Sequence, residues 1–329
     1  MTTLRWGILG PGRIAPRMVR AVGKTPRGEL LAVASRDRER AAAFARTHDI
    51  PRSFGSYDDL LADAELDVVY ISLPNHLHAE WTIRALESGK HVLCEKPLAM
   101  DVDQVDAIMA ASERTGRIAV EAFMYLHHPQ ILRAVELAQG GDLGALVLVH
   151  GSFSFFLTYP DDPRVDLAKG GGSLWDVGCY PVSFARRVAG EEPDGLAAFA
   201  RFDPAGVDRT FVGQLHFPGG LLAQFDSGFA APDRQRLEIV GAEATLVLDA
   251  PFLTDPDGPP PSLTRWSGQN ASPIPVPTVD QVHLEVEDLT SAIIDGSPPR
   301  IDLSWSRGTI ATLVHLDRTA RANAGLTPR

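Results

Sequence analysis

Two segments carry side chains whose types and spacing suit acid–base chemistry. Lys96 follows a short apolar run, so it stands at the carboxyl end of an expected strand, where ligands of open α/β sheets bind. In the glycine-rich segment 170–180, Asp176 and Tyr180 are four residues apart and would share one face of a helix. A carboxylate and a phenol that project together could orient a sugar or a diol. The plainer interpretations are a surface lysine and a buried tyrosine hydrogen-bonded to an aspartate.

The first third of the chain, which must position Lys96, alternates short apolar runs with helical patterns. Such strand–helix repeats predict a doubly wound parallel sheet. The run 67–73 is nearly all apolar, as expected of a strand covered on both faces. The expected strands are 4–9, 30–34, 67–73, 91–94 and 117–120, and the expected helices are 13–25, 38–47, 80–88 and 103–115.

The pattern changes after about Ala122. Strand patterns then follow one another at hairpin spacing with few helices between them, which favours antiparallel pairing. Residues 251–277 are rich in Pro, Gly, Ser and Asp, and we expect them to form a surface excursion. The expected strands are 146–156, 196–202, 210–217, 221–229, 236–240 and 245–249, and the expected helices are 279–294 and 304–324.

Composition and charge bound the function. The length of 329 residues suggests about two domains. Thirty-one basic and forty-two acidic side chains give a net charge of −11, which argues against nucleic acid and anionic membrane surfaces as partners. The apolar runs fall short of the ~20 residues that span a bilayer. The only cysteines, Cys94 and Cys179, predict neither a disulfide scaffold nor a metal site, and the composition favours a cytoplasmic protein.

The segment between the first strand and the first helix, 10–15, fits the pattern G-x-G-x-x-A. The first glycine permits a tight turn, and the second lets a pyrophosphate approach the backbone. The helix that follows offers N–H groups and the positive end of its dipole. This predicts dinucleotide binding, with an ordinary strand–helix turn as the alternative. The residues of the turn that we expect at the cofactor are Gly10, Gly12, Arg13 and Ile14.

The end of the second strand predicts which dinucleotide binds. An NAD site normally places Asp or Glu there, to bind the ribose 2′-hydroxyl. Here Ser35 and Arg36 occupy that place, and a hydroxyl plus a guanidinium suits a 2′-phosphate. We therefore expect NADP rather than NAD, unless Arg36 is only a solvated residue at the start of a helix.

At this point the motifs resemble those of a known family. They appear in the order that is typical of the glucose–fructose oxidoreductase, inositol dehydrogenase and rhizopine catabolism (Gfo/Idh/MocA) family, over nearly the whole chain. The sequence is most similar to the branch of NADP-dependent D-xylose dehydrogenases and dimeric dihydrodiol dehydrogenases. Many members carry His where this chain has Tyr180, whereas that branch has Tyr. The motifs are 10–15, Leu73-Pro74-Asn75 with His78, Glu95-Lys96-Pro97, Glu121–Tyr125 and 170–182.

The resemblance implies an N-terminal Rossmann domain over 1–122 and an α/β domain over 123–329 for substrate binding and oligomerisation. The second domain would have a large open, mostly antiparallel sheet, which often forms the dimer interface, so a homodimer or a dimer of dimers is expected. The C-terminal helix could pack back on the first domain. By resemblance, the cofactor is bordered by Leu73, Pro74, Asn75, His78, Glu95 and Lys96. His78 could equally begin the following helix.

The resemblance also implies that Lys96 contacts the nicotinamide ribose and the reacting oxygen. Tyrosine has a pKa near ~10, too high for a base at neutral pH, but a neighbouring lysine cation would lower it. Tyr180 would then take the hydroxyl proton, or return it in the reverse direction. Asp176 would bind a substrate hydroxyl or fix the Lys96 ammonium. Weaker candidates for substrate contact are Tyr125, Arg164 and Trp175.

These residues predict an NADP-dependent oxidoreductase that acts on a sugar or a cyclic diol, with the cofactor supplying the hydride chemistry. A glycosidase that uses a held nicotinamide transiently and a non-catalytic dinucleotide-binding sensor are the alternatives. The sensor has no need of a proton-transferring pair. The sequence names neither the sugar nor the physiological direction.

We expect Arg36→Ala to lose most of the preference for NADP over NAD, because a charge-assisted hydrogen bond is worth about ten- to a hundred-fold in affinity. Steady-state kinetics with the two cofactors measure that ratio. An unchanged preference would remove Arg36 from the role.

Overall fold

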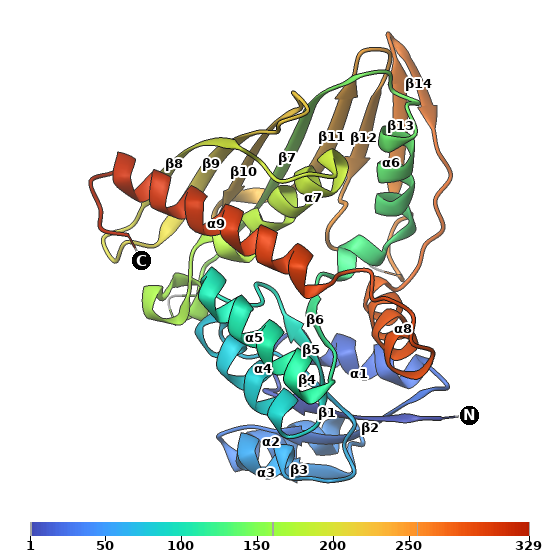
Figure 1. Cartoon of the computed structure of the whole chain (residues 1–329), viewed down its shortest axis with the longest axis vertical. Coiled ribbons are helices and arrows are strands. Elements are labelled where there is room, and N and C mark those ends of the chain that lie inside the picture. Colours follow the sequence, from blue (N-terminus) through green and yellow to red (C-terminus); the bar gives the residue numbers. More distant parts are fainter. Residues whose placement is uncertain (1, 160, 255, 329) are drawn as a thin grey trace. The chain divides into compact units, whose positions relative to one another are not determined.

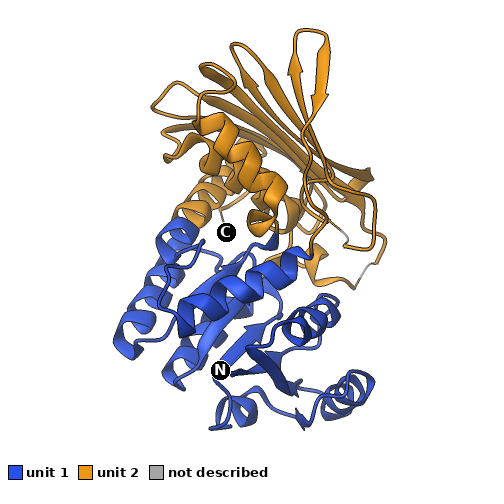
Figure 2. Cartoon of the chain, turned by 90° about the vertical axis from the view of Figure 1, so that its right-hand side faces the viewer, with its two compact units in different colours: residues 1–124, 280–307 blue, residues 125–279, 308–329 orange. Residues whose placement is uncertain are grey.

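The computed structural model describes residues 2–159, 161–254 and 256–328. These residues form two compact units (Figure 2). The first unit comprises residues 1–124 and 280–307, and the second comprises 125–279 and 308–329. The chain therefore passes from one unit to the other three times, and each unit has a sheet of its own.

The first unit is built on a six-stranded parallel sheet with the order β3-β2-β1-β4-β5-β6 (Figure 1). Every residue of β4 is buried, which explains its unbroken run of apolar side chains. The strands are β1 (Leu4–Leu9), β2 (Gly28–Ala34), β3 (Arg52–Phe54), β4 (Val68–Ile71), β5 (His91–Glu95) and β6 (Ala119–Ala122). The helices are α1 (Ala15–Lys24), α2 (Arg38–Thr47), α3 (Tyr57–Leu61), α4 (His78–Glu87), α5 (Val102–Thr115) and α8 (Gln281–Ile294).

The parallel sheet agrees with the expected fold class, and α2 covers the expected residues. Its N-cap is Asp37, whose carboxylate accepts from the Glu39 and Arg40 amides. The short β3 and α3 were not expected. Three-residue strands and five-residue helices give too few positions for a periodic pattern to stand out.

The helix α8 belongs to the first unit, although the linear division of the sequence assigned all of 123–329 to one domain. Polar contacts hold it against the region around α1. Lys24 pairs with Asp280 at 2.6 Å, and Arg27 pairs with Asp295 at 2.7 Å. The His283 ring lies 3.1 Å from the Ala21 carbonyl oxygen. These contacts join residues more than 250 positions apart, which no local sequence pattern reports.

The second unit has an eight-stranded sheet with the order β14-β13-β12-β11-β7-β10-β9-β8. All its strand pairs are antiparallel except β7 with β10. The strands are β7 (Leu146–Phe156), β8 (Gly195–Phe202), β9 (Asp208–His216), β10 (Leu222–Gly228), β11 (Ala230–Gly241), β12 (Thr245–Asp249), β13 (Ser262–Ser267) and β14 (Asn270–Pro273). The helices are α6 (Pro129–Gln139), α7 (Cys179–Ala189) and α9 (Leu303–Asn323), which begins in the first unit.

The expected surface excursion over 251–277 is only partly correct. It contains β13 and β14, which extend the sheet beyond β12. Eight prolines lie in residues 251–277, and they concealed the strand pattern. The excursion also supplies Phe252, which is fully buried.

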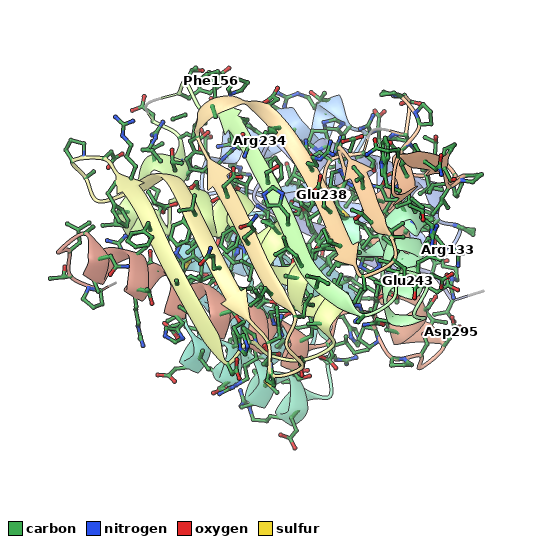
Figure 3. The ribbon with its side chains drawn as sticks, turned by 90° about the horizontal axis from the view of Figure 1, so that it is seen from above. Arg133, Phe156, Arg234, Glu238, Glu243 and Asp295 are labelled. Atoms are coloured by element: carbon green, nitrogen blue, oxygen red, sulfur yellow. The ribbon has the colours of Figure 1, made fainter. Side chains whose placement is uncertain are left out.

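One face of the second sheet is open. In Figure 1, α6, α7 and α9 lie against the other face. Figure 3 looks onto the open face, where Phe156 of β7 and Arg234 and Glu238 of β11 project. Adjacent apolar side chains on this face are exposed, with Phe199 63% accessible and its cross-strand partner Val212 44% accessible.

Candidate active site

The turn between β1 and α1 runs close to the end of β4. Gly10 has a φ of +87°, a conformation that favours glycine. A Cβ at Gly10 would lie 2.7 Å from Leu73 Cδ2 and 3.0 Å from the Ser72 carbonyl oxygen. A Cβ at Gly12 would lie 3.2 Å from that same oxygen. The Ser72 hydroxyl donates to the Gly10 carbonyl. Both glycines are therefore required by close packing as well as by the turn.

In the described part of the first unit, α1 and α4 begin without a capping side chain, and of these two helices α1 is the one that follows the glycine turn. By contrast, α2, α3, α5 and α8 each begin with an Asp or Ser that accepts from backbone amides of the first turn. Ile14 occupies the N-cap position of α1 and has no acceptor atom in its side chain. The positive end of this helix is thus left for an external anion, beside the glycine turn. This fits the pyrophosphate of a dinucleotide.

Basic and hydroxyl side chains lie at the end of β2. Ser35 is buried, and its hydroxyl accepts from the Asp37 amide at 3.2 Å. Arg36 is exposed. Arg40 donates from Nη2 to the Pro11 carbonyl at 2.9 Å, so a second guanidinium lies beside the glycine turn. Arg40 was not predicted from the sequence, although it lies in the first turn of α2, only four residues after Arg36.

The loops after β4 and β5 are neighbours because those strands pair in parallel, with Ile71 opposite Cys94. Their facing ends lie at the carboxyl edge of the sheet, as the sequence analysis expected for Lys96. The Lys96–Pro97 peptide bond is cis. His78 is buried, and both of its ring nitrogens meet backbone carbonyls. The other expected cofactor contacts on these loops are Leu73, Pro74, Asn75 and Glu95.

Buried acids surround Glu95. The fully buried Tyr70 donates its hydroxyl to Glu95, and burial raises the pKa of Tyr70, so the phenol remains a neutral donor. Glu285 of α8 is also buried. Burial raises its pKa well above the usual value, and the charges of Glu95, Asp288 and Glu121 raise it further. Burial and the neighbouring charges therefore favour the protonated form of Glu285, which limits the negative charge next to Glu95.

In the second unit, the segment before α7 is a π-helical turn, Leu174–Gly178, and not the expected α-helix. Hydrogen bonds of a π-turn run from residue i to i+5, so Asp176 and Tyr180 do not repeat as on an α-helical face. The turn leaves the Asp176 side chain 18% accessible, while Tyr180 is only 4% accessible. Such turns occur frequently at functional sites.

Asp208 of β9 fixes the start of that π-turn. Its carboxylate is fully buried and accepts from the Ser173 hydroxyl at 2.7 Å and from the Leu174 amide at 2.8 Å. Ser227 of β10 lies 3.2 Å from the Ser173 hydroxyl. Asp208 was not predicted from the sequence, because a residue so far along the chain shows no spacing that relates it to Asp176.

The three glycines before the turn pack tightly. Gly170 and Gly172 have φ values of +80° and +130°. A Cβ at Gly171 would lie 2.6 Å from the Arg164 carbonyl oxygen, and the Gly172 amide donates to that oxygen at 2.9 Å. These glycines therefore bring the segment around Arg164 against the turn that carries Asp176.

Arg164 connects this segment to Asp176. Its Nε lies 3.2 Å from Asp162, and its Nη1 lies 3.6 Å from Asp176. The guanidinium carbon also lies 5.6 Å from the ring centre of Phe155, within the range of a cation–π contact. Arg164 thus lies between two carboxylates, those of Asp162 and Asp176.

Tyr180 sits in a cluster of aromatic rings. Its ring centre lies 5.3 Å from those of Tyr125 and Phe153 and 5.2 Å from that of Phe252. The Tyr125 hydroxyl lies 2.6 Å from the Ser183 hydroxyl and donates to the Tyr180 carbonyl at 3.2 Å. Burial raises the pKa of Tyr125, so this donor remains neutral. The expected substrate contacts Tyr125 and Trp175 are both buried, at or below 1% accessibility.

The geometry divides the candidate residues between the two units. The first unit offers an anion-receptive helix start, two arginines and a lysine at one sheet edge. The second offers an Asp and a Tyr on a buried turn. Across the described ranges, no cluster of His, Cys, Asp and Glu is suited to a metal ion, and no helix is long and apolar enough to cross a membrane.

A parallel sheet with this turn, joined to a mostly antiparallel sheet, is the architecture of two-domain Rossmann oxidoreductases. Residues 4–123 match the model described as "Oxidoreductase family, NAD-binding Rossmann fold", and residues 131–247 match the GFO/IDH/MocA C-terminal domain. The chain belongs to the GFO/IDH/MocA family of oxidoreductases, which confirms both the resemblance and the expected fold class.

Similar proteins lie in the expected branch. A D-xylose 1-dehydrogenase (NADP(+)) of Haloferax volcanii is 37% identical over 98% of this chain and 99% of its own. A trans-1,2-dihydrobenzene-1,2-diol dehydrogenase of Bos taurus is 34% identical over 83% of this chain and 80% of its own. The crystal structure of a 3-ketoreductase from Actinomadura kijaniata, in complex with NADP and TDP-benzene, has a TM-score of 0.89 and 29% identity over 96% of this chain and 97% of that chain.

We expect Asp208→Ala to lower the free energy of unfolding by about 2–4 kcal/mol, because two buried donors would lose their acceptor. Asp208→Asn keeps one acceptor oxygen and should cost less. Chemical denaturation measures both variants. Asp194→Ala, which removes an exposed aspartate of the same unit, is the matched control. Equal stability of Asp208→Ala and the wild type would contradict this role.

Proposed function

We propose that this protein is an NADP-dependent oxidoreductase that transfers a hydride between the nicotinamide and a hydroxyl or carbonyl carbon of a sugar or cyclic diol. The observation that carries the proposal is the uncapped start of α1 beside the glycine turn. The relatives named above are dehydrogenases and a ketoreductase, and two of them are described with NADP.

The choice of NADP rests on the end of β2. The Ser35 hydroxyl and the exposed Arg36 stand where an NAD site has an acid. Arg40 adds a second guanidinium beside the glycine turn. Two guanidinium groups and a hydroxyl supply the donors that a 2′-phosphate requires, and none of the three is a carboxylate of the kind that binds the 2′-hydroxyl in an NAD site.

When bound, NADP supplies the hydride chemistry, and the protein orients the substrate and handles one proton. In the direction of oxidation, Tyr180 as tyrosinate accepts the proton of the substrate hydroxyl. In the direction of reduction, the Tyr180 phenol donates that proton to the alkoxide oxygen. Lys96 favours the tyrosinate through its positive charge and donates a hydrogen bond to the reacting oxygen.

Asp176 binds a neighbouring hydroxyl of the substrate. Arg164 supports this role because its guanidinium lies 3.6 Å from the Asp176 carboxylate, and a carboxylate accepts hydrogen bonds from two adjacent hydroxyls. Such a pair favours polyols over simple alcohols. We place the reaction in the cytoplasm, in agreement with two free, buried cysteines.

The test is NADPH formation, followed by absorbance, against a panel of pentoses, hexoses, inositols and cyclic diols. We expect turnover with at least one vicinal diol or sugar and a preference for NADP. Tight NADP binding without absorbance change on any substrate favours a sensor, and cleavage of glycosides without net NADPH favours the glycosidase alternative.

The matched variant in that assay is Tyr180→Phe, which keeps the ring among its aromatic neighbours and removes only the hydroxyl. Turnover should fall by about 10²- to 10⁴-fold, the usual contribution of general acid–base catalysis, while NADP affinity stays unchanged. Near-normal turnover would exclude Tyr180 as the proton-transferring group.

We further propose that two copies associate through the open face of the second sheet. Phe199, Val212 and Leu222 give this face exposed apolar area on three adjacent strands. Exposed apolar patches of this kind mark association surfaces. Two charged pairs add polar complementarity: Arg236 with Glu238 on β11, and Arg234 of β11 with Asp226 of β10.

Phe199→Asp should convert the dimer to a monomer, because a charge would be buried without a partner. Sedimentation equilibrium measures the mass of the wild type and the variant. Leu326→Asp, at an exposed leucine near the C-terminus, should leave the mass unchanged. A monomeric wild type would contradict the dimer without affecting the proposed reaction.

A further inference from the structure

The buried ring of His78 joins the two loops that carry the expected cofactor and reaction residues. His78 is the first residue of α4 and is 1% accessible. Its Nδ1 lies 2.7 Å from the Pro97 carbonyl oxygen, and its Nε2 lies 2.7 Å from the Leu73 carbonyl oxygen. Both nitrogens are therefore used inside the first unit, and the ring has no polar atom left for a ligand.

The two carbonyls belong to different functional segments. Pro97 directly follows Lys96, so a bond to its carbonyl fixes the backbone from which the lysine projects. Leu73 begins the loop that follows β4. Since β4 and β5 pair in parallel, these loops leave the same edge of the sheet side by side, and no strand pairing holds them beyond Ile71 and Cys94.

The Leu73 side also reaches the phosphate-binding turn. The Leu73 side chain packs where a Cβ of Gly10 would lie, and the Ser72 hydroxyl donates to the Gly10 carbonyl. A shift of Leu73 would therefore move the side chain against which the glycine turn packs. His78 is thus the link between the turn that would hold the pyrophosphate and the lysine at the reacting end.

The protonation state of the His78 ring decides how many of the two carbonyls receive a hydrogen bond. A neutral imidazole has one N–H, so it donates to one of the two carbonyls, whereas an imidazolium donates to both. Burial lowers the pKa of His78, the two carbonyls oppose that shift, and the charges of Lys96 and His76 lower the pKa further. Each ring nitrogen lies 2.7 Å from a carbonyl oxygen, which can only accept, so both bonds exist together only when the ring is an imidazolium, and the geometry favours that form against the effect of burial.

We propose that His78 is a positioning residue with two separable actions: its Nε2 edge holds the Leu73 loop for dinucleotide affinity, and its Nδ1 edge holds Pro97 and hence Lys96 for turnover. The inference deepens the proposed function and rests on it.

Two amide substitutions separate the actions, because each reproduces one edge of the imidazole. The amide nitrogen of Asn lies near the position of Nδ1, and that of Gln lies near the position of Nε2. His78→Asn should keep the Pro97 bond and lose the Leu73 bond. His78→Gln should keep the Leu73 bond and lose the Pro97 bond.

The measurements are the dissociation constant of NADPH, by fluorescence titration of the full chain, and kcat at saturating cofactor. The loss of one hydrogen bond is worth about fivefold. His78→Asn should weaken NADPH binding by about that factor and leave kcat near the wild-type value, whereas His78→Gln should lower kcat by about fivefold or more and leave NADPH affinity unchanged. Thr82→Val, which removes a buried hydroxyl one turn further along α4, should change neither.

Equal changes of both parameters in both variants would mean that the ring merely packs, and would overturn the proposal. If only His78→Asn folds, it must weaken NADPH binding without changing kcat. If only His78→Gln folds, it must lower kcat without changing NADPH affinity. In the wild type, NADPH should shift the ring ¹⁵N signals of His78, and an unaltered spectrum at saturation would also overturn the proposal. If the wild type binds no NADPH, the proposed function itself fails and takes this inference with it. If NADPH binds but the crossed effects are absent, only the inference fails.

Discussion

The close approach of the Gly10 turn to the end of β4 is the constraint on which the candidate cofactor site depends. A side chain at Gly10 would collide with Leu73 and with the Ser72 carbonyl, so the turn can form only with glycine. That contact sets where α1 begins, and α1 has no capping side chain of its own. The His78 ring extends the same packing to the loop of Lys96. The packing around Gly10 therefore also positions the loops that follow β4 and β5.

In the second unit, a buried carboxylate holds the backbone of the candidate site in place. Asp208 accepts from two groups at the start of the π-turn, and the glycines before that turn allow the backbone of Arg164 to come close. Asp176 is left partly accessible while Tyr180 is enclosed by aromatic rings. The net charge of −11 is compatible with an anionic cofactor, because helix dipoles and a few arginines act within a few ångströms while exposed charges are screened by salt.

Much of the fold could be predicted from local patterns. The alternation of apolar runs with helical patterns predicted the parallel sheet. Strand patterns at hairpin spacing predicted the antiparallel one. The predictions failed where the pattern was short or interrupted. The strand β3 has three residues, the prolines of 251–277 concealed β13 and β14, and α8 joins the first unit through contacts such as that of Lys24 with Asp280. An α-helical face was expected for Asp176, but a π-turn occurs there. The prediction failed because periodicity does not distinguish an α-helix from a π-turn over five residues.

The sequence by itself determined the family and the class of enzyme, because a glycine turn between a strand and a helix, followed by the later motifs in their order, is shared with that family. The tertiary structure alone decided how those residues are held. It showed that His78 serves two backbone carbonyls, that Arg40 lies beside the glycine turn, and that Asp208 anchors the π-turn. The physical reason is that hydrogen bonds between distant segments depend on the packing of whole strands and helices, and spacing along the chain does not record that packing.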